Sequence, residues 1–218
     1  DEDALPVPLR QRDQVIEMYK PIADRGLAWL HGNHEDSLRR IGSITADICK
    51  GLGIPYGSKM CKLKLSTTRG KQICKCLLWH PRRVSITSKA KDAIQRNANM
   101  TASLKRLLER KAGDCLVMAV GHIHKLLMYD PDAAMNQELI LLDDDVSLQQ
   151  EYLGAGDGAA RYIEPQRRYY CATGSFLRSY VVGKDSYAED YNFDPVELGY
   201  IVLHIRRSKV AGMSKVVL

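Results

Sequence analysis

The chain has 218 residues, of which 45% are hydrophobic and 27% charged, a composition that excludes global disorder and allows a sizeable core. No apolar run approaches the roughly 18 residues that indicate a membrane span, and the first residues lack the features of a signal peptide. The net charge of +6 favours anionic partners such as nucleic acid.

The six cysteines are scattered through apolar stretches and form no C-x-x-C pair, so neither a zinc ribbon nor a thioredoxin-like motif is supported. Only Cys74 and Cys76 lie close together, and alternation along a strand would put both on one face. With no secretory signal in view, we expect reduced, buried thiols and a cytoplasmic location, or the host cytoplasm for a phage protein.

Apolar spacing in the first quarter of the chain predicts two helices separated by a short strand. The first helix covers residues 10–25 and is ended or kinked by its proline, and the strand covers residues 26–30. The second helix runs from Leu38 to Leu52, with Asp36 or Ser37 as its cap.

The middle of the chain predicts more strands than helices. Cys61–Ser66 and Gln72–Trp79 read as a hairpin with Gly70 in its turn. One or two helices follow within residues 88–111, and Cys115–Val120 is a buried strand.

Toward the end of the chain, residues 143–160 are rich in Asp, Gln and Gly and predict an exposed loop or insertion. Arg167–Ala172 and Tyr200–Ile205 complete the strands, and the tail after Arg206 is polar and expected to fray. Without an internal repeat or a long linker, we expect a single α/β domain over residues 1–218.

Polar side chains with metal-ligating atoms stand at the ends of three predicted strands. They are Asn33 and His34 after the first strand, His80 after the second strand of the hairpin, and His122 and His124 after 115–120. Strands of one α/β sheet end at a common edge, where ligands bind. Imidazole nitrogens and an amide oxygen suit Mn, Zn, Fe or Ni better than Ca or Mg. The pattern therefore favours a metal site, whereas each histidine alone is more often a satisfied polar residue.

Gly32-Asn33-His34-Glu35, followed by His80 and then by Gly121-His122-Ile123-His124, resembles the G-N-H-[DE] … H … G-H-x-H signature of calcineurin-like metallophosphoesterases. The likeness covers roughly residues 10–207 and is strongest to a phage and prokaryotic branch of that family. It implies a four-layer αββα sandwich of two mixed sheets, an enzyme that hydrolyses phosphate esters, and two divalent metal ions, Mn first, with Zn, Fe, Ni or Mg as alternatives.

The resemblance also implies roles for individual residues. Asn33, His80 and His122 would bind one metal ion and His124 the other. His34 would stand beside the scissile phosphate, where an imidazole can stabilise charge or protonate the leaving oxygen. Glu35 would fix an imidazole or a loop from behind the ligands.

The family's D-x-H and G-D-x-x-[DN] motifs are absent from residues 1–218. They would supply further ligands and the carboxylate that bridges the two ions. By the family's spacing we expect these motifs upstream of residue 1, and we therefore expect the domain to be incomplete at its N-terminus.

Pro81-Arg82-Arg83 replaces the glycine-rich continuation common after this histidine in the family. Arg82 or Arg83 is a candidate to bind a non-scissile phosphate, with a solvated loop as the alternative. The basic stretch at 89–111 could follow a nucleic-acid backbone, although a solvated helix face is the favoured interpretation.

Three hypotheses about function follow. The first is a phosphomono- or phosphodiesterase, with a nuclease acting on DNA or RNA as the favoured version. The second is a small-molecule phosphatase or nucleotide pyrophosphohydrolase that uses the same site. The third is a catalytically inactive scaffold that keeps the fold without the metal pair.

Overall fold

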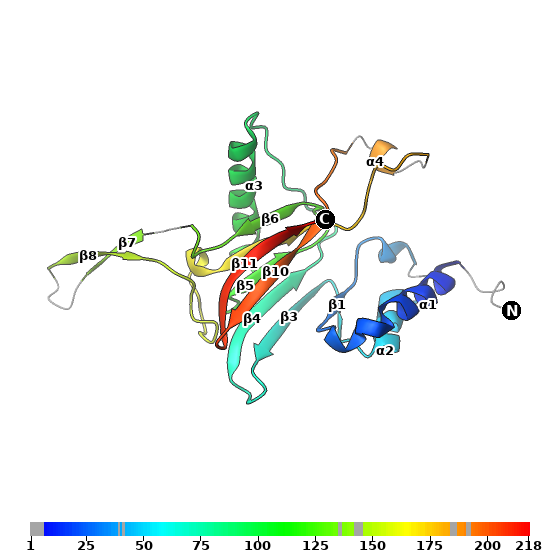
Figure 1. The fold of residues 1–218 in the computed structure, drawn as a ribbon, viewed down its shortest axis with the longest axis horizontal. Coiled ribbons are helices and arrows are strands. Elements are labelled where there is room, and N and C mark those ends of the chain that lie inside the picture. Colours follow the sequence, from blue (N-terminus) through cyan, green and yellow to red (C-terminus); the bar gives the residue numbers. More distant parts are fainter. Residues whose placement is uncertain are drawn as a thin grey trace. The chain divides into compact units, whose positions relative to one another are not determined.

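The computed structural model describes residues 7–38, 40, 42–134, 137–141, 146–183, 187–190 and 193–218 (Figure 1). Its contacts divide the chain into two compact units, residues 1–63 with 78–84 and residues 64–77 with 85–218. Within the described ranges, no helix is both long and apolar enough to cross a membrane.

The first unit is built on two helices that pack against each other. Ile44, Ile48 and Leu52 of α2 form its core together with Ile54, and α1 covers them with Val15 and Ile16. A short parallel pair of strands lies beside them, with Trp29 opposite Tyr56. The elements in chain order are α1 (Val7–Tyr19), η2 (Lys20–Arg25), β1 (Trp29–Leu30), η3 (Glu35–Leu38), α2 (Ile44–Leu52) and β2 (Tyr56–Gly57).

The second helix begins later than the sequence predicts. It starts at Ile44, with Ser43 at its N-cap, rather than at Leu38, and the residues expected to cap it serve other purposes. Asp36 binds side chains, and the Ser37 hydroxyl donates to the carbonyl of His34. The predicted C-terminal end is confirmed, because Gly53 takes the left-handed conformation that ends α2.

The largest sheet has five strands in the order β3-β4-β5-β9-β6. Its centre is mixed, since β9 runs parallel to β5 and antiparallel to β6. This confirms the α/β class. The strands are β3 (Met60–Ser66), β4 (Gln72–Trp79), β5 (Val117–Val120), β6 (Leu126–Tyr129) and β9 (Tyr169–Thr173); the helices of this part of the chain are α3 (Ala93–Leu108), η4 (Pro165–Arg167) and α4 (Tyr187–Asp190).

Burial follows the strand patterns read from the sequence. The half-exposed strand β3 alternates between exposed and partly buried residues, whereas residues 115–120 are buried throughout. The predicted helical stretch at 88–111 contains one helix, α3, and strand β9 is followed by a turn with Gly174 at φ +82°. A Cβ at Gly174 would collide with the backbone of Gly199, so this turn brings β9 close to the start of β10.

Two further hairpins complete the fold. Strands β10 (Gly199–Arg206) and β11 (Lys209–Val217) pair antiparallel and pack against β9 and β6 (Figure 1). The prediction of a frayed tail after Arg206 is therefore wrong, because half-buried residues such as Val210 and the buried Met213 alternate there with exposed ones. Within the expected loop at 143–160, residues 148–152 form the exposed strand β8 (Leu148–Tyr152), which pairs with β7 (Gln137–Leu141).

The cysteines are all free, and five of the six are buried. Cys74 and Cys76 share one face of β4, with their sulfur atoms 3.8 Å apart, as the alternation predicted. Burial raises the pKa of Cys171, in the central strand β9, to about 12. This thiol thus ionises far less readily in the folded chain than in the unfolded one.

We expect the folded state to lose stability above about pH 9, because unfolded thiols ionise there while the Cys171 thiol, whose folded pKa is raised, stays protonated up to about pH 12. Above about pH 9 the free energy of unfolding should therefore fall with pH, and Cys171→Ala should make this fall less steep by up to about 1.4 kcal/mol per pH unit. Urea unfolding between pH 8 and pH 11 measures the free energy of unfolding at each pH. Cys61→Ala, at a less buried thiol, is the control, and equal slopes in both variants would contradict the expectation.

Candidate functional site

The Gly32-Asn33-His34-Glu35 segment forms the turn that leaves strand β1. The backbone of the strand is anchored by Trp29 N–H, which donates to the carbonyl of Pro55 at 3.0 Å, and by His31 N–H, which donates to the carbonyl of Ser58 at 2.8 Å. The short helix η3 follows at once. The turn is thus held at both ends, and it presents Asn33 and His34 between them.

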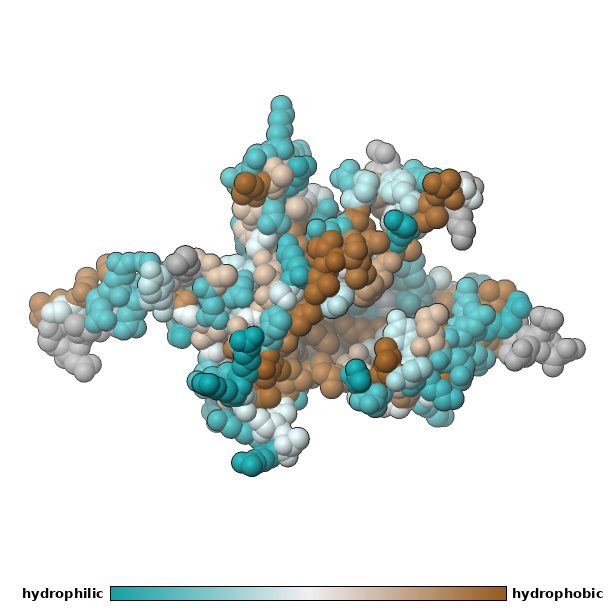
Figure 2. Space-filling view, viewed as in Figure 1, coloured by the Kyte–Doolittle hydropathy of each residue, from teal (hydrophilic) through white to brown (hydrophobic). Residues whose placement is uncertain are grey.

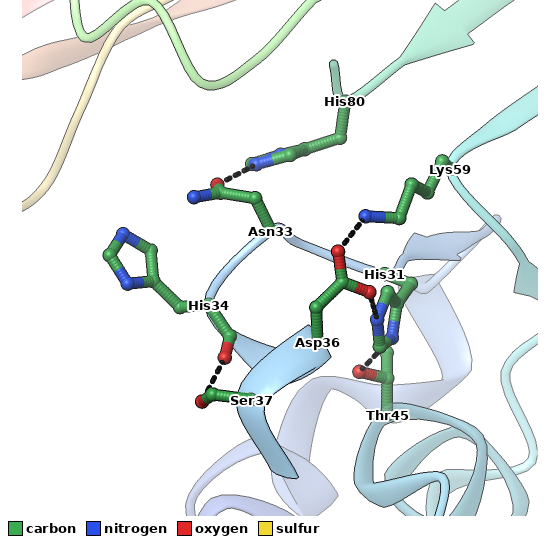
Figure 3. A network of polar contacts seen from close by, with 8 residues as sticks. All are labelled: His31, Asn33, His34, Asp36, Ser37, Thr45, Lys59 and His80. Atoms are coloured by element: carbon green, nitrogen blue, oxygen red, sulfur yellow. Dashed lines mark hydrogen bonds and ion pairs between the residues drawn. The ribbon is translucent and has the colours of Figure 1, made fainter. Parts of the chain in front are cut away.

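His80 meets this turn from the end of strand β4. Its backbone N–H donates to the carbonyl of Lys59 at 2.8 Å, which fixes the start of its side chain. Its ring then reaches Asn33, and His80 Nε2 donates to Asn33 Oδ1 at 3.0 Å (Figure 3). Two residues that are 47 positions apart in the sequence are therefore in direct contact.

The donor pair fits a divalent ion of the Mn or Zn kind. Ligand atoms about 2.1 Å from an ion, and about 90° apart around it, are separated by about 3.0 Å. Asn33 Oδ1 and His80 Nε2 have the same separation in the structure. An amide oxygen and an imidazole nitrogen are also the ligand types that such ions accept. Binding would replace the proton that His80 now donates, as metal binding to imidazole requires.

The opposite side of the turn is fixed by a carboxylate that the sequence did not mark as important. Asp36 Oδ1 accepts from His31 Nε2 at 3.0 Å, and its Oδ2 is bound by Lys59 Nζ (Figure 3). The other ring nitrogen of His31 lies 3.1 Å from the hydroxyl of Thr45, in the first turn of α2. Asp36 is only 9% exposed in its side chain, so these contacts act with little screening by water.

Figure 3 shows how this polar network relates to the ligand pair. Asn33 is turned toward His80, while Asp36 is turned away from it, toward His31 and Lys59. The turn is therefore held from one side and leaves its other side for a ligand. A cavity of about 460 Å³ opens next to the network, and its lining residues are His31, Gly42, Ser43, Tyr56, Ser58 and Lys59.

The G-H-x-H motif lies in the second unit, directly after strand β5. His122 and His124 both have left-handed backbone conformations, with φ of 69° and 53°. Residues other than glycine are uncommon in this region, and each one costs about 1–2 kcal/mol relative to ordinary backbone. Backbone strain of this kind is concentrated at functional sites. The motif is thus a strained loop in which the two histidines, and not Gly121, take the left-handed conformation.

The remaining predicted residues lie in the same unit as Asn33 and His80. The carboxylate of Glu35 folds back over Gly32, where an added Cβ would lie 3.3 Å from Glu35 Cδ. Arg82 and Arg83 follow His80 and are exposed, and His34 is exposed as well. These side chains are therefore accessible to a substrate.

The structure brings Asn33 and His80 together within the first unit and places His122 and His124 on one loop of the second. Across the described residues, no group of three or more His, Cys, Asp or Glu side chains is gathered closely enough to hold a metal ion. Sequence reasoning missed Asp36, Lys59 and Thr45. Their spacing carries no motif from which their contacts could be predicted.

Comparison with models of protein families, with curated proteins and with solved structures finds no match to this chain.

Asp36→Ala is expected to lower the free energy of unfolding by about 2 kcal/mol or more, because it leaves His31 and Lys59 without their carboxylate. Urea unfolding measures the loss. Asp47→Ala is the matched control, since Asp47 is half exposed and its ion pair with Arg12 is long, at 3.9 Å; it should change stability by less than about 0.5 kcal/mol. Similar losses in both variants would contradict a special role for Asp36.

His124→Gly is expected to raise the free energy of unfolding by about 1 kcal/mol, since glycine tolerates the left-handed backbone at this position. The same variant should bind Mn²⁺ more weakly. His204→Gly in strand β10 is the control, because glycine in a strand should lower stability by about 0.5–1 kcal/mol. Strain at the motif is refuted if both glycine variants are destabilised equally.

Proposed function

We propose that this chain is a metal-dependent phosphoesterase that hydrolyses phosphate monoesters or diesters. The observation that carries the proposal is the convergence of Asn33 Oδ1 and His80 Nε2, 3.0 Å apart, on a turn that also presents His34. The strained histidines of the G-H-x-H loop support it independently. The order of these motifs along the chain matches that of calcineurin-like metallophosphoesterases.

Under this proposal, Asn33, His80 and His122 hold one divalent ion and His124 the other, with Mn as the first choice. When bound, two such ions would clamp a phosphate and activate water. The four-layer sandwich of that family belongs to the same proposal. The packing of β10 and β11 against β9 and β6 supports it, because it adds a second layer of strands. A cytoplasmic setting is also part of the proposal, and the six free thiols agree with it.

The chain's own residues then have separate tasks. His34 is exposed and lies next to the ligand Asn33, so its imidazole can donate a proton to the leaving oxygen of a bound ester. Arg82 and Arg83 can bind a phosphate oxygen that does not react, since guanidinium groups match phosphate in geometry. The contact between Asp36 and His31 keeps the turn in place. The side chain of Asn33 is therefore already positioned when an ion binds, and binding does not have to order the turn.

The test uses hydrolysis of a small chromogenic phosphodiester in the presence of Mn²⁺, together with Mn²⁺ titration by calorimetry. His34→Ala should lower kcat by about 10² to 10⁴-fold and leave Mn²⁺ affinity unchanged, because this side chain acts on the substrate. His80→Ala should weaken Mn²⁺ binding by more than about 100-fold, because it removes a ligand. Loss of a residue that only hydrogen-bonds a ligand weakens metal binding by roughly 10–100-fold.

His204→Ala is the matched control, since His204 lies on strand β10 and contacts Ser214 at 2.8 Å. It should change neither binding nor rate. A folded chain that binds Mn²⁺ and hydrolyses nothing would favour the inactive scaffold. Full activity in His34→Ala would remove that residue from the catalytic step, and unchanged Mn²⁺ binding in His80→Ala would exclude the metal site proposed above.

A further inference from the structure

Charge is distributed very unevenly along this sequence. Residues 59–111 contain fifteen lysines and arginines but only two acidic residues, which gives this stretch a net charge of +13. The rest of the chain has seventeen basic and twenty-four acidic residues and a net charge of −7. The overall value of +6 therefore conceals a strongly basic segment within an acidic remainder.

Helix α3 is the longest helix of this basic segment, and it contains no acidic residue between Ala93 and Leu108. The two acidic residues of the segment flank it. Asp92 is engaged as the N-cap, where its carboxylate accepts from the N–H of Gln95 at 2.7 Å, and Glu109 stands at the C-cap. Exposed helices of globular proteins ordinarily intersperse acids among their bases as i,i+4 partners. Helix α3 has none.

One face of α3 is apolar and is already covered. Leu104 and Leu108 are fully buried where the helix packs against β6 and β9. The face away from this contact carries Arg96, Asn99 and Arg106, which are exposed, with Ser103 between them. These residues are spaced three and four apart, so they form a continuous stripe along the helix. Figure 2 shows mainly hydrophilic surface around this projecting helix.

The stripe is ordered by its own contacts. Arg106 Nη2 donates to Ser103 Oγ at 3.1 Å, and Ser103 Oγ donates to the carbonyl of Asn99 at 2.9 Å. Asn99 in turn donates to Ser88 Oγ at 3.2 Å, just before the helix. Among the described residues, neither Arg96 nor Arg106 forms an ion pair, and the same holds for Arg110 beyond the C-cap.

We infer that this face of α3, from Arg96 to Arg110, binds the sugar-phosphate backbone of a nucleic acid. The inference also names nucleic acid as the substrate of the proposed phosphoesterase, and this part of it rests on the proposed function. The binding itself does not. Arginine binds phosphate in a bidentate manner, and asparagine and serine side chains are common donors to phosphate and sugar. The distance along the helix from Arg96 to Arg110 is about 20 Å, enough for several phosphates of one strand.

An anionic lipid surface fits the same charges less well. Helices that lie on membranes insert an apolar face into the bilayer. The apolar face of α3 is instead occupied by the sheet, and the exposed large apolar side chain of the helix, Ile94, stands near its first residue. A polyanion that needs contacts with charge and hydrogen-bond donors alone is the better match.

The experiment measures binding of a fluorescently labelled short DNA duplex, and of a single strand of the same sequence, by anisotropy in EDTA, so that no metal site is needed. The variant R96Q/R106Q/R110Q removes three charges and keeps good helix formers. Its affinity should fall by about tenfold or more, and the slope of log K against log salt should decrease by about 0.9 for each lost phosphate contact.

The control R206Q/R207Q/K209Q removes three charges from the exposed turn between β10 and β11 in the same unit. It should keep the salt slope of the unaltered chain. Equal losses in the two variants, or no binding by the unaltered chain, would overturn the inference. So would tighter binding to vesicles of phosphatidylserine and phosphatidylcholine than to DNA.

Hydrolysis of the small chromogenic diester separates this inference from the proposed function. The α3 variant should hydrolyse it at an unchanged rate, because the diester is too short to reach beyond the catalytic residues. If the chain hydrolyses the diester but does not bind DNA, the phosphoesterase proposal holds and the inference about α3 is overturned. If the chain binds DNA through α3 but hydrolyses nothing, the inference about α3 holds and the phosphoesterase proposal is overturned.

Discussion

The carboxylate of Asp36 holds together three segments that are distant in sequence, and the geometry of the candidate site depends on it. It binds His31 at the end of β1 and Lys59 just before β3, and through His31 it reaches Thr45 in α2. These contacts define where the turn after β1 lies. Since the turn carries Asn33, the distance from Asn33 to His80 follows from an interaction in which neither takes part. A buried charge with two partners is costly to separate, so the turn is rigid.

The two units use free energy in opposite ways at the residues that the sequence motifs single out. Around Asp36 the ligand turn is stabilised by paired charges, whereas at His122 and His124 the backbone is held in a conformation that these residues ordinarily avoid. The strained loop follows a strand that is buried along its whole length, and this strand supplies the stability that the loop lacks. Helix α3 shows a third case, in which like charges gather without acidic residues among them.

Much of the fold could be predicted from sequence, because the strands follow simple rules of alternation. The pattern of β3, the buried strand before Gly121 and the end of α2 at Gly53 were all identified in this way. The start of α2 was missed, since Asp36 suits a helix cap by its chemistry and nothing local shows that His31 and Lys59 compete for it. Strand β11 was missed because its polar residues suggested fraying, although its alternation is that of a strand packed on one face. For the site, sequence patterns identified the candidate ligands but not the support behind them.

The parallel pairing of β5 with β9 has a consequence for how the chain folds. Val117 lies opposite Tyr169, so β5 and β9 can pair only when the ends of the whole intervening segment have come together. The helix pair α1–α2 and the hairpin β10–β11 need no such closure and can form early. The β7–β8 arm lies within the closing segment, yet it adds little to the barrier, because each doubling of a flexible loop costs only about 0.6 kcal/mol. The middle of this protein can therefore vary in length without delaying the assembly of its core.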